Sequence, residues 1–319
     1  MISICSSPRI ADEKASILVI HQGALGDFVL ILPFLLTLRK YYNIDLFCKR
    51  QNGIIAQYFK AAEKVLSVES QIFSSIFSKN PDQIIKDMIK SYKKILLFSF
   101  SEELKRKISL LAKKDCDIFL IPPRPDKEKR IHVSEYIEKR LFEIGLLKEK
   151  MPPQNAVINS DGITILHPGS GSKRKRWDVS NFLKLFYMLE SEGIKTSFLI
   201  GPAEIDLLSV LKKHIPQKKL FVIDDTFYLL KTLSSAKGFI GNDSGVSHLS
   251  AFMGIPTLAI FGPSDPVRWK PVGSRVAVLR GADQCRPCFE ISEKNCSPIP
   301  CLSNIKPAQV FQEYKKLIS

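Results

Sequence analysis

Three glycine-containing loops hold the residue types in this sequence that could do chemistry. Residues 21–27 end on an aspartate, Asp27, whose carboxylate could act as a general base. Residues 167–177 combine small residues and hydroxyls with four consecutive cations, Lys173–Arg176, which suit a phosphate or diphosphate. Residues 241–248 run into an expected helix whose first amides could bind further phosphate oxygens. Together the loops predict a cleft enzyme that holds a nucleotide in its second half and an acceptor in its first.

Asp27 allows two interpretations that can hold together. It could cap the helix expected over residues 27–41, where the helix dipole would keep the carboxylate ionised and only modestly basic. It could also be a general base at the mouth of a sheet. Gly23 and Gly26 would let the backbone approach a ligand closely. The spacing matches neither the dinucleotide fingerprint nor a P-loop, because no Gly-Lys-Ser/Thr follows.

The other two loops also have structural alternatives. The basic run could be a solvated loop, with Trp177 as a packing residue. Ser244 and Gly245 could offer amides to phosphate, while Asp243 could cap the helix. His248 could be a structural histidine rather than a ligand contact.

Short β-branched runs alternate with amphipathic stretches along the chain. This alternation predicts an α/β protein whose parallel sheets are covered on both faces, with ligands at the carboxyl ends of the strands. We expect helices over residues 102–113, 126–150, 178–192 and 203–214, besides the one over 27–41. The expected strands cover 17–20, 45–48, 95–98, 118–121, 163–167, 196–200, 220–223, 238–240 and 257–261.

The length of 319 residues suggests about two domains. Residues 151–155 form the best candidate linker, because two prolines interrupt the pattern before it restarts. We therefore expect two doubly wound, Rossmann-like domains, an acceptor-binding one over 1–155 and a nucleotide-binding one over 156–319, which the family resemblance given below makes a nucleotide-sugar-binding domain. The last helix could pack back on the first domain.

The composition narrows the classes of protein and partner. With 45% hydrophobic and 25% charged residues, the chain is typical of a globular protein rather than collagen, a disordered tail or a small disulfide scaffold. Lys and Arg number 47 against 32 Asp and Glu, a net charge of +15, which favours an anionic partner such as nucleic acid, a membrane surface or a phosphorylated substrate. No secretory signal is visible, and the longest apolar stretch, Phe28–Leu38, is too short to span a bilayer. We expect a cytoplasmic protein.

Motifs in these loops resemble those of glycosyltransferase family 9, the ADP-heptose:lipopolysaccharide heptosyltransferases. They follow the family's order and span most of the chain. The matching segments are Ile17–Ile20 with Gly26, Asp27 and Pro33; His167–Ser170 with Lys175 and Trp177; Gly241–Gly245 with His248 and Leu249; and Gly254–Thr257 leading to Phe261–Pro266.

The resemblance implies a GT-B fold, two Rossmann-like domains facing across a cleft. It also implies inverting transfer of heptose from ADP-heptose to the inner core of lipopolysaccharide, with Kdo-lipid A or a heptosyl sugar as acceptor. The family roles carried over are a catalytic base at Asp27; the diphosphate loop at Ser170, Gly171 and Lys175; the second donor loop at Asp243, Ser244, Gly245 and His248; and a ribose-binding carboxylate at Glu204.

The same resemblance suggests a binding partner for the positively charged surface. The family's acceptors are acidic lipids of the inner membrane, so Lys86–Lys94 and Lys105–Lys114 could face anionic headgroups in a peripheral contact. They could equally be solvated basic faces. No acidic DxD-type cluster occurs in either donor loop, so a divalent cation is possible but not required. We expect a monomer that does not bind nucleic acid, because basic and aromatic residues are not interleaved. A same-fold enzyme with another nucleotide-sugar, or with an O-antigen or protein acceptor, is the alternative.

The sequence also contains a cysteine cluster near its C-terminal end. Paired thiols of this kind could hold zinc or an iron–sulfur group, but the spacing is not that of a standard finger or ribbon. We expect reduced or adventitiously paired thiols instead. The cluster consists of Cys285, Cys288, Cys296 and Cys301.

Overall fold

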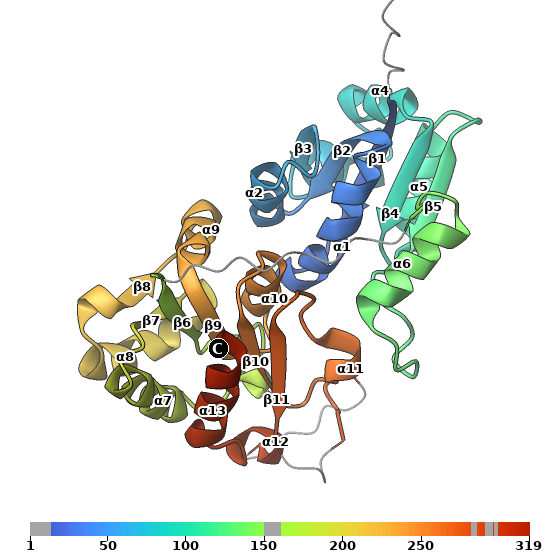
Figure 1. Cartoon of the computed structure of the whole chain (residues 1–319). Helices are drawn as coiled ribbons and strands as arrows, with labels where there is room; N and C mark the ends of the chain where they lie inside the picture. The colour runs from blue at the N-terminus through green and yellow to red at the C-terminus, as the bar shows by residue number, and fades with distance from the viewer. Residues whose placement is uncertain (1–13, 150–160, 282–285, 291–295, 297–298) are drawn as a thin grey trace, which may run out of the picture.

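A computed structural model describes residues 14–149, 161–281, 286–290, 296 and 299–319. It contains two parallel sheets, each covered by helices on both faces (Figure 1). The predicted α/β class with two doubly wound units is confirmed. The linker expected at 151–155, and with it the boundary at residue 155, lies outside the described residues.

The first sheet places the Asp27 loop where ligands bind in doubly wound folds. Its order is β3(Lys64–Ser67), β2(Tyr42–Cys48), β1(Ala15–His21), β4(Lys94–Phe98) and β5(Asp117–Ile121). All pairs are parallel, and Ile20 on β1 lies between Phe47 and Leu97. The strand order reverses beside β1, so the loop after β1 lies at the topological switch point.

Helices cover this sheet on both faces, which explains why β1 is apolar throughout. Ile17 and Val19 face a core with α1(Leu25–Leu38), α2(Arg50–Tyr58) and α6(Val133–Glu143). Leu18 and Ile20 face a separate core on the opposite side. That core is formed with α3(Gln71–Ser74), η1(Ser75–Phe77), α4(Gln83–Ser91) and α5(Glu102–Leu111).

The second sheet brings the other two loops together. Its order is β11(Val276–Arg280), β10(Thr257–Phe261), β9(Ala236–Asn242), β6(Ile163–His167), β7(Thr196–Ile200) and β8(Leu220–Val222). β6 and β9 are parallel neighbours, with His167 opposite Gly241. The loops after these two strands therefore emerge side by side at the switch point of the second sheet.

The helices of the second sheet also form two layers. α7(Val179–Ser191), α8(Leu208–His214) and α13(Pro307–Ile318) share a core on one face. α9(Thr226–Ser234) and α10(Gly245–Phe252) lie on the other. α13 packs on α7, β10 and β11, and the Tyr314 hydroxyl lies 2.7 Å from Thr164 Oγ1. The suggestion that the last helix returns to the first domain is therefore wrong, because its apolar face is used on the second sheet.

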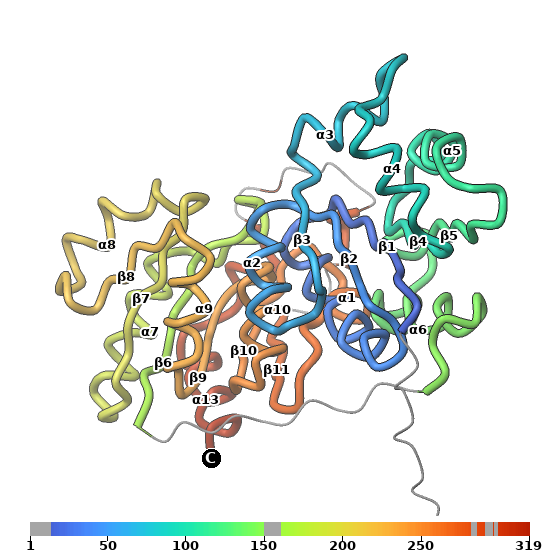
Figure 2. Tube along the Cα trace, turned by 90° about the horizontal axis from the view of Figure 1, so that it is seen from above, coloured from blue at the N-terminus to red at the C-terminus, as the bar shows by residue number. Residues whose placement is uncertain are grey.

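The two units meet through helices that follow their central strands. α1 packs on α10 and α2 packs on α9, as Figure 2 shows from above. One hydrophobic core runs continuously from α1 to α10, and Phe59 and Phe252 stack edge-to-face across it at 4.9 Å. The packing of α1 on α10 places helices that follow the central strands of the two sheets against each other.

Most expected elements are present, and the differences have simple causes. Two strands were not predicted, β3 and β11, which both lie at sheet edges. The helix expected over 203–214 is divided into a 3₁₀ segment, η3(Pro202–Leu207), followed by α8. Within 126–149, α6 is the only described helix, because the proline-rich run before it continues as a loop. Within the described segments, no helix combines the length and apolar character that crossing a membrane requires.

Candidate active site

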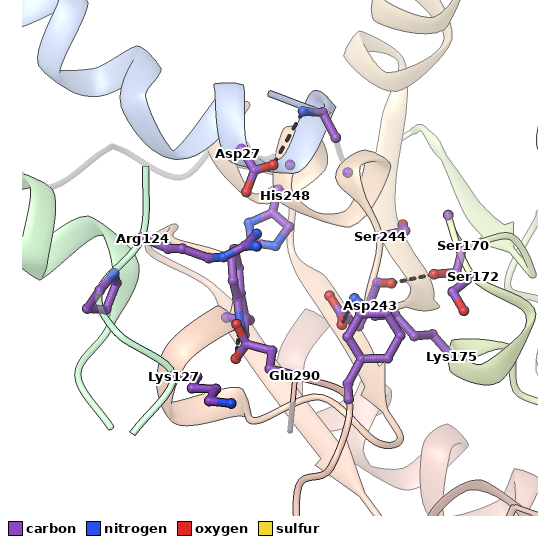
Figure 3. Close-up of a pocket in the computed structure, with 17 residues that line it drawn as sticks. Asp27, Arg124, Lys127, Ser170, Ser172, Lys175, Asp243, Ser244, His248 and Glu290 are labelled. Carbon is purple, nitrogen blue, oxygen red and sulfur yellow. Dashed lines mark hydrogen bonds and ion pairs between the residues drawn. The ribbon is translucent and has the colours of Figure 1, made fainter. Parts of the chain in front are cut away.

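A cavity of about 500 Å³ lies between the two units, where the three loops converge. Asp27 enters it from the start of α1, and Arg124 and Lys127 enter from the loop that follows β5 (Figure 3). Side chains from the second unit form the other wall. They include Ser170, Ser172, Lys175, Asp243, Ser244, His248, Phe289 and Glu290.

Asp27 sits in the first turn of α1 and faces this cavity. The helix begins at Leu25, two residues earlier than expected, and Ala24 is its N-cap. Asp27 Oδ2 accepts a hydrogen bond from the Ala24 amide at 3.3 Å. The carboxylate therefore satisfies a helix-start amide and also faces the space where an acceptor would lie, so both interpretations of Asp27 remain compatible.

The environment makes Asp27 more basic than the sequence suggested. Burial raises the pKa of the Asp27 carboxyl above its ordinary value. The charge of Arg124, the Ala24 amide and the charges of Lys175 and Lys49 oppose that rise without cancelling it. Desolvation, which the local sequence does not show, thus outweighs the groups that favour the charged form of the Asp27 carboxyl.

The two glycines of the first loop have different surroundings. A β-carbon on Gly23 would lie 2.8 Å from His21 Cε1, so its backbone approaches protein rather than open space. Gly26 lines the cavity and faces Gly245, whose own β-carbon would lie 2.9 Å from Gly26 N. The two positions thus differ: the His21 side chain occupies the space beside Gly23, whereas the close backbone approach at Gly26 is required by the lack of a side chain on Gly245.

Lys175 and Asp243 form an ion pair in the cavity wall, with Nζ 2.8 Å from Oδ2. The Lys175 ammonium also lies over the Phe289 ring, 4.2 Å from its centroid. Asp243 was weighed as a helix cap, but Ser244 takes that role and accepts a hydrogen bond from the Ser247 amide. Asp243 instead orients the cation of the other donor loop.

Lys175 is the only one of the four consecutive cations that lines this cavity of the described chain. Arg176 makes two contacts of 3.0 and 3.1 Å with Asp206, and Lys173 lies 3.4 Å from the same carboxylate. Arg174 lies over the Phe289 ring instead. Of the four cations, Lys175 is therefore the one placed where it could contact a ligand in this cavity, and its diphosphate-binding role stays a prediction.

Hydrogen bonds tie the two donor loops to each other. Ser170 Oγ donates to the Asp243 carbonyl at 2.7 Å. Asn242 Nδ2 donates to the Pro168 carbonyl at 2.8 Å, and Asn242 Oδ1 accepts from the Trp177 amide at 2.9 Å. The Ser170 hydroxyl is thus committed to protein. The role of Asn242 in joining the two loops was not predicted. Its position at the end of a strand, between a glycine and Asp243, was the signal that could have indicated it.

His248 lies in α10 and borders the cavity while almost completely buried. Burial lowers its pKa to about 4, although the charge of Asp243 acts in the opposite direction. The imidazole is therefore neutral near pH 7. Within the described chain, its Nδ1 is buried without a hydrogen-bond partner.

A second cavity of about 350 Å³ adjoins the first and shares Gly26, Ser170, Gly171 and Gly245 with it. Glu204 borders this second cavity, and its Oε2 accepts a hydrogen bond from the Gly201 amide at 2.9 Å. The carboxylate packs where a β-carbon on Gly169 would lie 2.1 Å from Glu204 Cδ. Glu204 is therefore fixed at the end of β7, beside the loop that carries Ser170.

Several charged residues of the site escaped the sequence argument. Arg124 and Lys127 follow β5, and Glu290 comes from a segment distant in sequence. The position of Arg124 in the loop that follows a strand of the sheet was the available signal. Nothing local in the sequence indicated Glu290.

The cysteine cluster can be assessed only in part. Cys285 lies outside the described residues. Cys288 and Cys296 are free thiols, and Cys301 is buried. No group of three or more metal-ligating side chains occurs among the residues that the structure describes. The metal hypothesis therefore stays a prediction.

Comparison with known proteins decides the family. The family model described as glycosyltransferase family 9 (heptosyltransferase) matches residues 104–297, more than half of the chain. The chain belongs to glycosyltransferase family 9. The resemblance inferred from the loop motifs is confirmed. A cavity between two doubly wound sheets is consistent with the glycosyltransferase activity of the family.

Relatives of this family 9 member extend over nearly its whole length. It is 28% identical over 326 aligned residues to a lipooligosaccharide heptosyltransferase 2 of Campylobacter jejuni, covering 92% of this chain and 95% of the relative. The crystal structure of a family 9 glycosyl transferase from Veillonella parvula matches with a TM-score of 0.75 at 19% identity, over 97% and 98% of the two chains. E. coli ADP-heptose lps heptosyltransferase II matches with a TM-score of 0.71 at 17% identity, over 95% and 98%. The predicted GT-B fold is confirmed.

Proposed function

We propose that this family 9 member transfers heptose from ADP-heptose to an inner-core sugar of lipopolysaccharide, either Kdo-lipid A or a heptosyl acceptor, with inversion and with Asp27 as the general base. One observation carries the proposal. Asp27, a half-buried carboxylate with a raised pKa, lines one side of the cavity between the two units. Lys175 and the start of α10 line the other side of the same cavity. A single displacement requires a base on one side of the reacting carbon and a site for the leaving diphosphate on the other.

The donor assignment rests on the two adjoining cavities. The smaller one suits the adenosine, with the Glu204 carboxylate positioned for the ribose hydroxyls. Lys175 and the start of α10 at Gly245 suit the diphosphate, because a cation and helix-start amides both favour phosphate oxygens. An E. coli heptosyltransferase WaaC with ADP matches this chain with a TM-score of 0.68 at 16% identity, over 95% and 99% of the two chains. That likeness supports the choice of ADP-heptose over other donors.

The proposed reaction is a single displacement. Asp27 removes the proton of the acceptor hydroxyl as its oxygen attacks the anomeric carbon of heptose. The bond from that carbon to the diphosphate oxygen breaks, and its electron pair leaves with ADP. Lys175 stabilises the charge that develops on the diphosphate, and attack from the face opposite ADP inverts the anomeric configuration.

Asp27→Asn tests the base assignment, because it keeps the shape and the Ala24 hydrogen bond while removing basicity. We expect turnover, followed as ADP release, to fall by about 10²- to 10⁴-fold with donor binding retained. Asp178→Asn is the matched control, since Asp178 caps α7 outside the three loops. If Asp27→Asn kept near-normal turnover, Asp27 would not be the base.

We further propose a peripheral contact between the first unit and the cytoplasmic face of the inner membrane. α4 and α5 cover the face of the first sheet opposite α1 and the second unit. On their outer sides, the apolar side chains Ile84 and Leu110 are 58% and 70% exposed, and Lys90 and Arg106 are exposed cations of the same two helices. Exposed apolar side chains among cations suit an anionic lipid surface.

A further inference from the structure

A third cavity, of about 700 Å³, adjoins the Asp27 cavity on the side away from the nucleotide loops. It shares Lys127, Phe289 and Glu290 with the Asp27 cavity, so the two cavities lie next to each other. Pro263 and Asp265 belong to the motif segment Phe261–Pro266, but none of the residues given a catalytic or donor-binding role by the resemblance lines this cavity. We call this space the basic cavity, and the charged residues that line it are Lys127, Glu128, Arg130, Asp265, Arg268, Arg286 and Glu290.

The floor of the basic cavity is a buried arginine that joins the two units. Arg268 is 2% exposed, and its Nε lies 2.8 Å from Glu290 Oε2. Its other nitrogens donate to the carbonyls of Pro125 at 3.1 Å and Asp126 at 2.8 Å, in the loop that carries Lys127. A buried guanidinium with this many partners holds that loop in a fixed position.

The remaining walls are fixed as well. Arg130 donates to both oxygens of Asp265, at 2.8 and 3.2 Å, which links the two units a second time. The Pro263 carbonyl accepts hydrogen bonds from the amides of Cys288 at 2.8 Å and Phe289 at 3.0 Å. These bonds hold the segment 286–290 over the cavity, so its shape exists before any ligand binds.

The charges of the walls leave a positive surplus. Asp265 and Glu290 are each neutralised by an arginine of the same wall. Lys127 and Arg286 take part in no ion pair within the described parts of the chain, and both are exposed to the cavity. Glu128 is the one further carboxylate among the residues lining it. The groups available to a ligand are therefore two cations against one carboxylate.

We propose that the basic cavity is a second acceptor subsite, which binds an anionic group, phosphate or carboxylate, on the part of the acceptor beyond the reacting sugar. This inference rests on the proposed function, which places the acceptor hydroxyl at Asp27. Lys127, Phe289 and Glu290 line both cavities, so the part of the acceptor beyond the reacting sugar would lie next to the basic cavity. Arg286 supplies a planar pair of donors that matches phosphate and carboxylate oxygens.

Arg286→Gln tests the subsite, because Arg286 lines the basic cavity and not the Asp27 cavity. With an acidic core acceptor, we expect the acceptor KM to rise about tenfold, while kcat and the ADP-heptose KM stay unchanged. Arg286→Lys should recover part of the affinity because it keeps the charge. Arg140→Gln is the control, since Arg140 pairs with Glu143 on the surface of α6.

Chemically altered acceptors identify the anionic group. Wild-type enzyme is compared on the acceptor, on its dephosphorylated form and on a form with its carboxylates converted to amides. The alteration that removes the true ligand group should raise the wild-type KM about tenfold, and Arg286→Gln should then add nothing. A KM increase that is equal for all three forms, or no increase at all, would overturn the subsite.

Binding of the lipid-free acidic oligosaccharide, measured by calorimetry without donor, separates failure of the subsite from failure of the proposed function. Weaker binding to Arg286→Gln than to wild type supports the subsite even if heptose transfer is not detected. Equal binding to both proteins contradicts it. Absence of ADP release by the wild-type enzyme on every acceptor contradicts the proposed function alone.

Discussion

Gly245 at the start of α10 lies against Gly26 at the start of α1, although the two helices belong to different units. A β-carbon on Gly245 would lie 2.8 Å from the Leu25 β-carbon and 2.9 Å from Gly26 N. A β-carbon on Gly26 would meet Gly245 Cα at an ordinary 3.6 Å. This asymmetric contact sets how far Asp27 lies from the donor loop.

Gly245→Ala should therefore separate the two helix starts. The added methyl group meets backbone as well as a side chain, so the helices must shift rather than a rotamer. We expect a loss of turnover larger than the loss of stability, measured by ADP release and thermal unfolding of the same preparation. Gly26→Ala is the comparison, since its methyl group finds room. Equal losses in the two variants would mean that the close approach has no role in alignment.

Lys175→Gln should impair the leaving-group side of the reaction. It removes the cation nearest the proposed diphosphate and leaves Asp243 facing it, so we expect kcat/KM for the donor to fall by about 10²- to 10³-fold. Lys173→Gln is a matched control two residues away, because Lys173 is largely exposed and lies near Asp206. Similar losses for both lysines would indicate a general charge effect rather than a specific contact.

The pH dependence of turnover should report the environment of Asp27. A base acts only when deprotonated, and burial raises the pKa of the Asp27 carboxyl, so kcat/KM should fall on the acid side at a pH above the ordinary aspartate value. Arg124 favours the charged carboxylate. Arg124→Gln should therefore move the acid limb to still higher pH, as measured in a pH series on both proteins. A shift to lower pH would show that Arg124 does not act on Asp27 electrostatically.

The loops were predictable from sequence because each joins a buried strand directly to a helix. Gly26 and Asp27 after β1, Ser170 after β6 and Ser244 after β9 needed only the strand–loop–helix pattern. Contacts between distant segments were not predictable in the same way. The pairing of Lys175 with Asp243 depends on β6 and β9 being neighbours, and local charge density suggested a role for Lys173 and Arg176 that Asp206 instead accounts for.

The edge strands of the sheets and the walls of the basic cavity were not predictable from local sequence either. β3 is four residues long and lies at an edge of its sheet, so its sequence has no strong period to detect. Arg268 lies in a four-residue helix, and it joins the two units by hydrogen bonds to carbonyls that are distant along the chain. Nothing in the local sequence indicates such partners.

Membrane contact through α4 and α5 should be dependent on salt and on anionic lipid. The double variant Lys90→Gln with Leu110→Ser should bind less to vesicles containing anionic phospholipid, in a sedimentation assay, with turnover on a soluble acceptor retained. Binding of wild type should weaken as ionic strength rises, because exposed charges are screened. Lys212→Gln with Val210→Ser on α8 is the control pair from the second unit. Equal vesicle binding by all three proteins would place the membrane contact elsewhere.

ADP should stabilise the protein more than UDP, and Glu204 should be part of the reason. A ligand that binds only the native state at a hundred times its Kd adds about 2.7 kcal/mol to the free energy of unfolding, so thermal unfolding with ADP-heptose, ADP-glucose and UDP-sugars ranks the donors directly. Glu204→Gln keeps the shape of the side chain against Gly169 but weakens the acceptor it offers to ribose hydroxyls. We expect a smaller ADP-induced shift and a higher donor KM with little change in kcat, because the ribose lies away from the bond that breaks. A variant with an unchanged ADP shift would remove Glu204 from the nucleotide site, and an equal response to UDP-sugars would favour another donor.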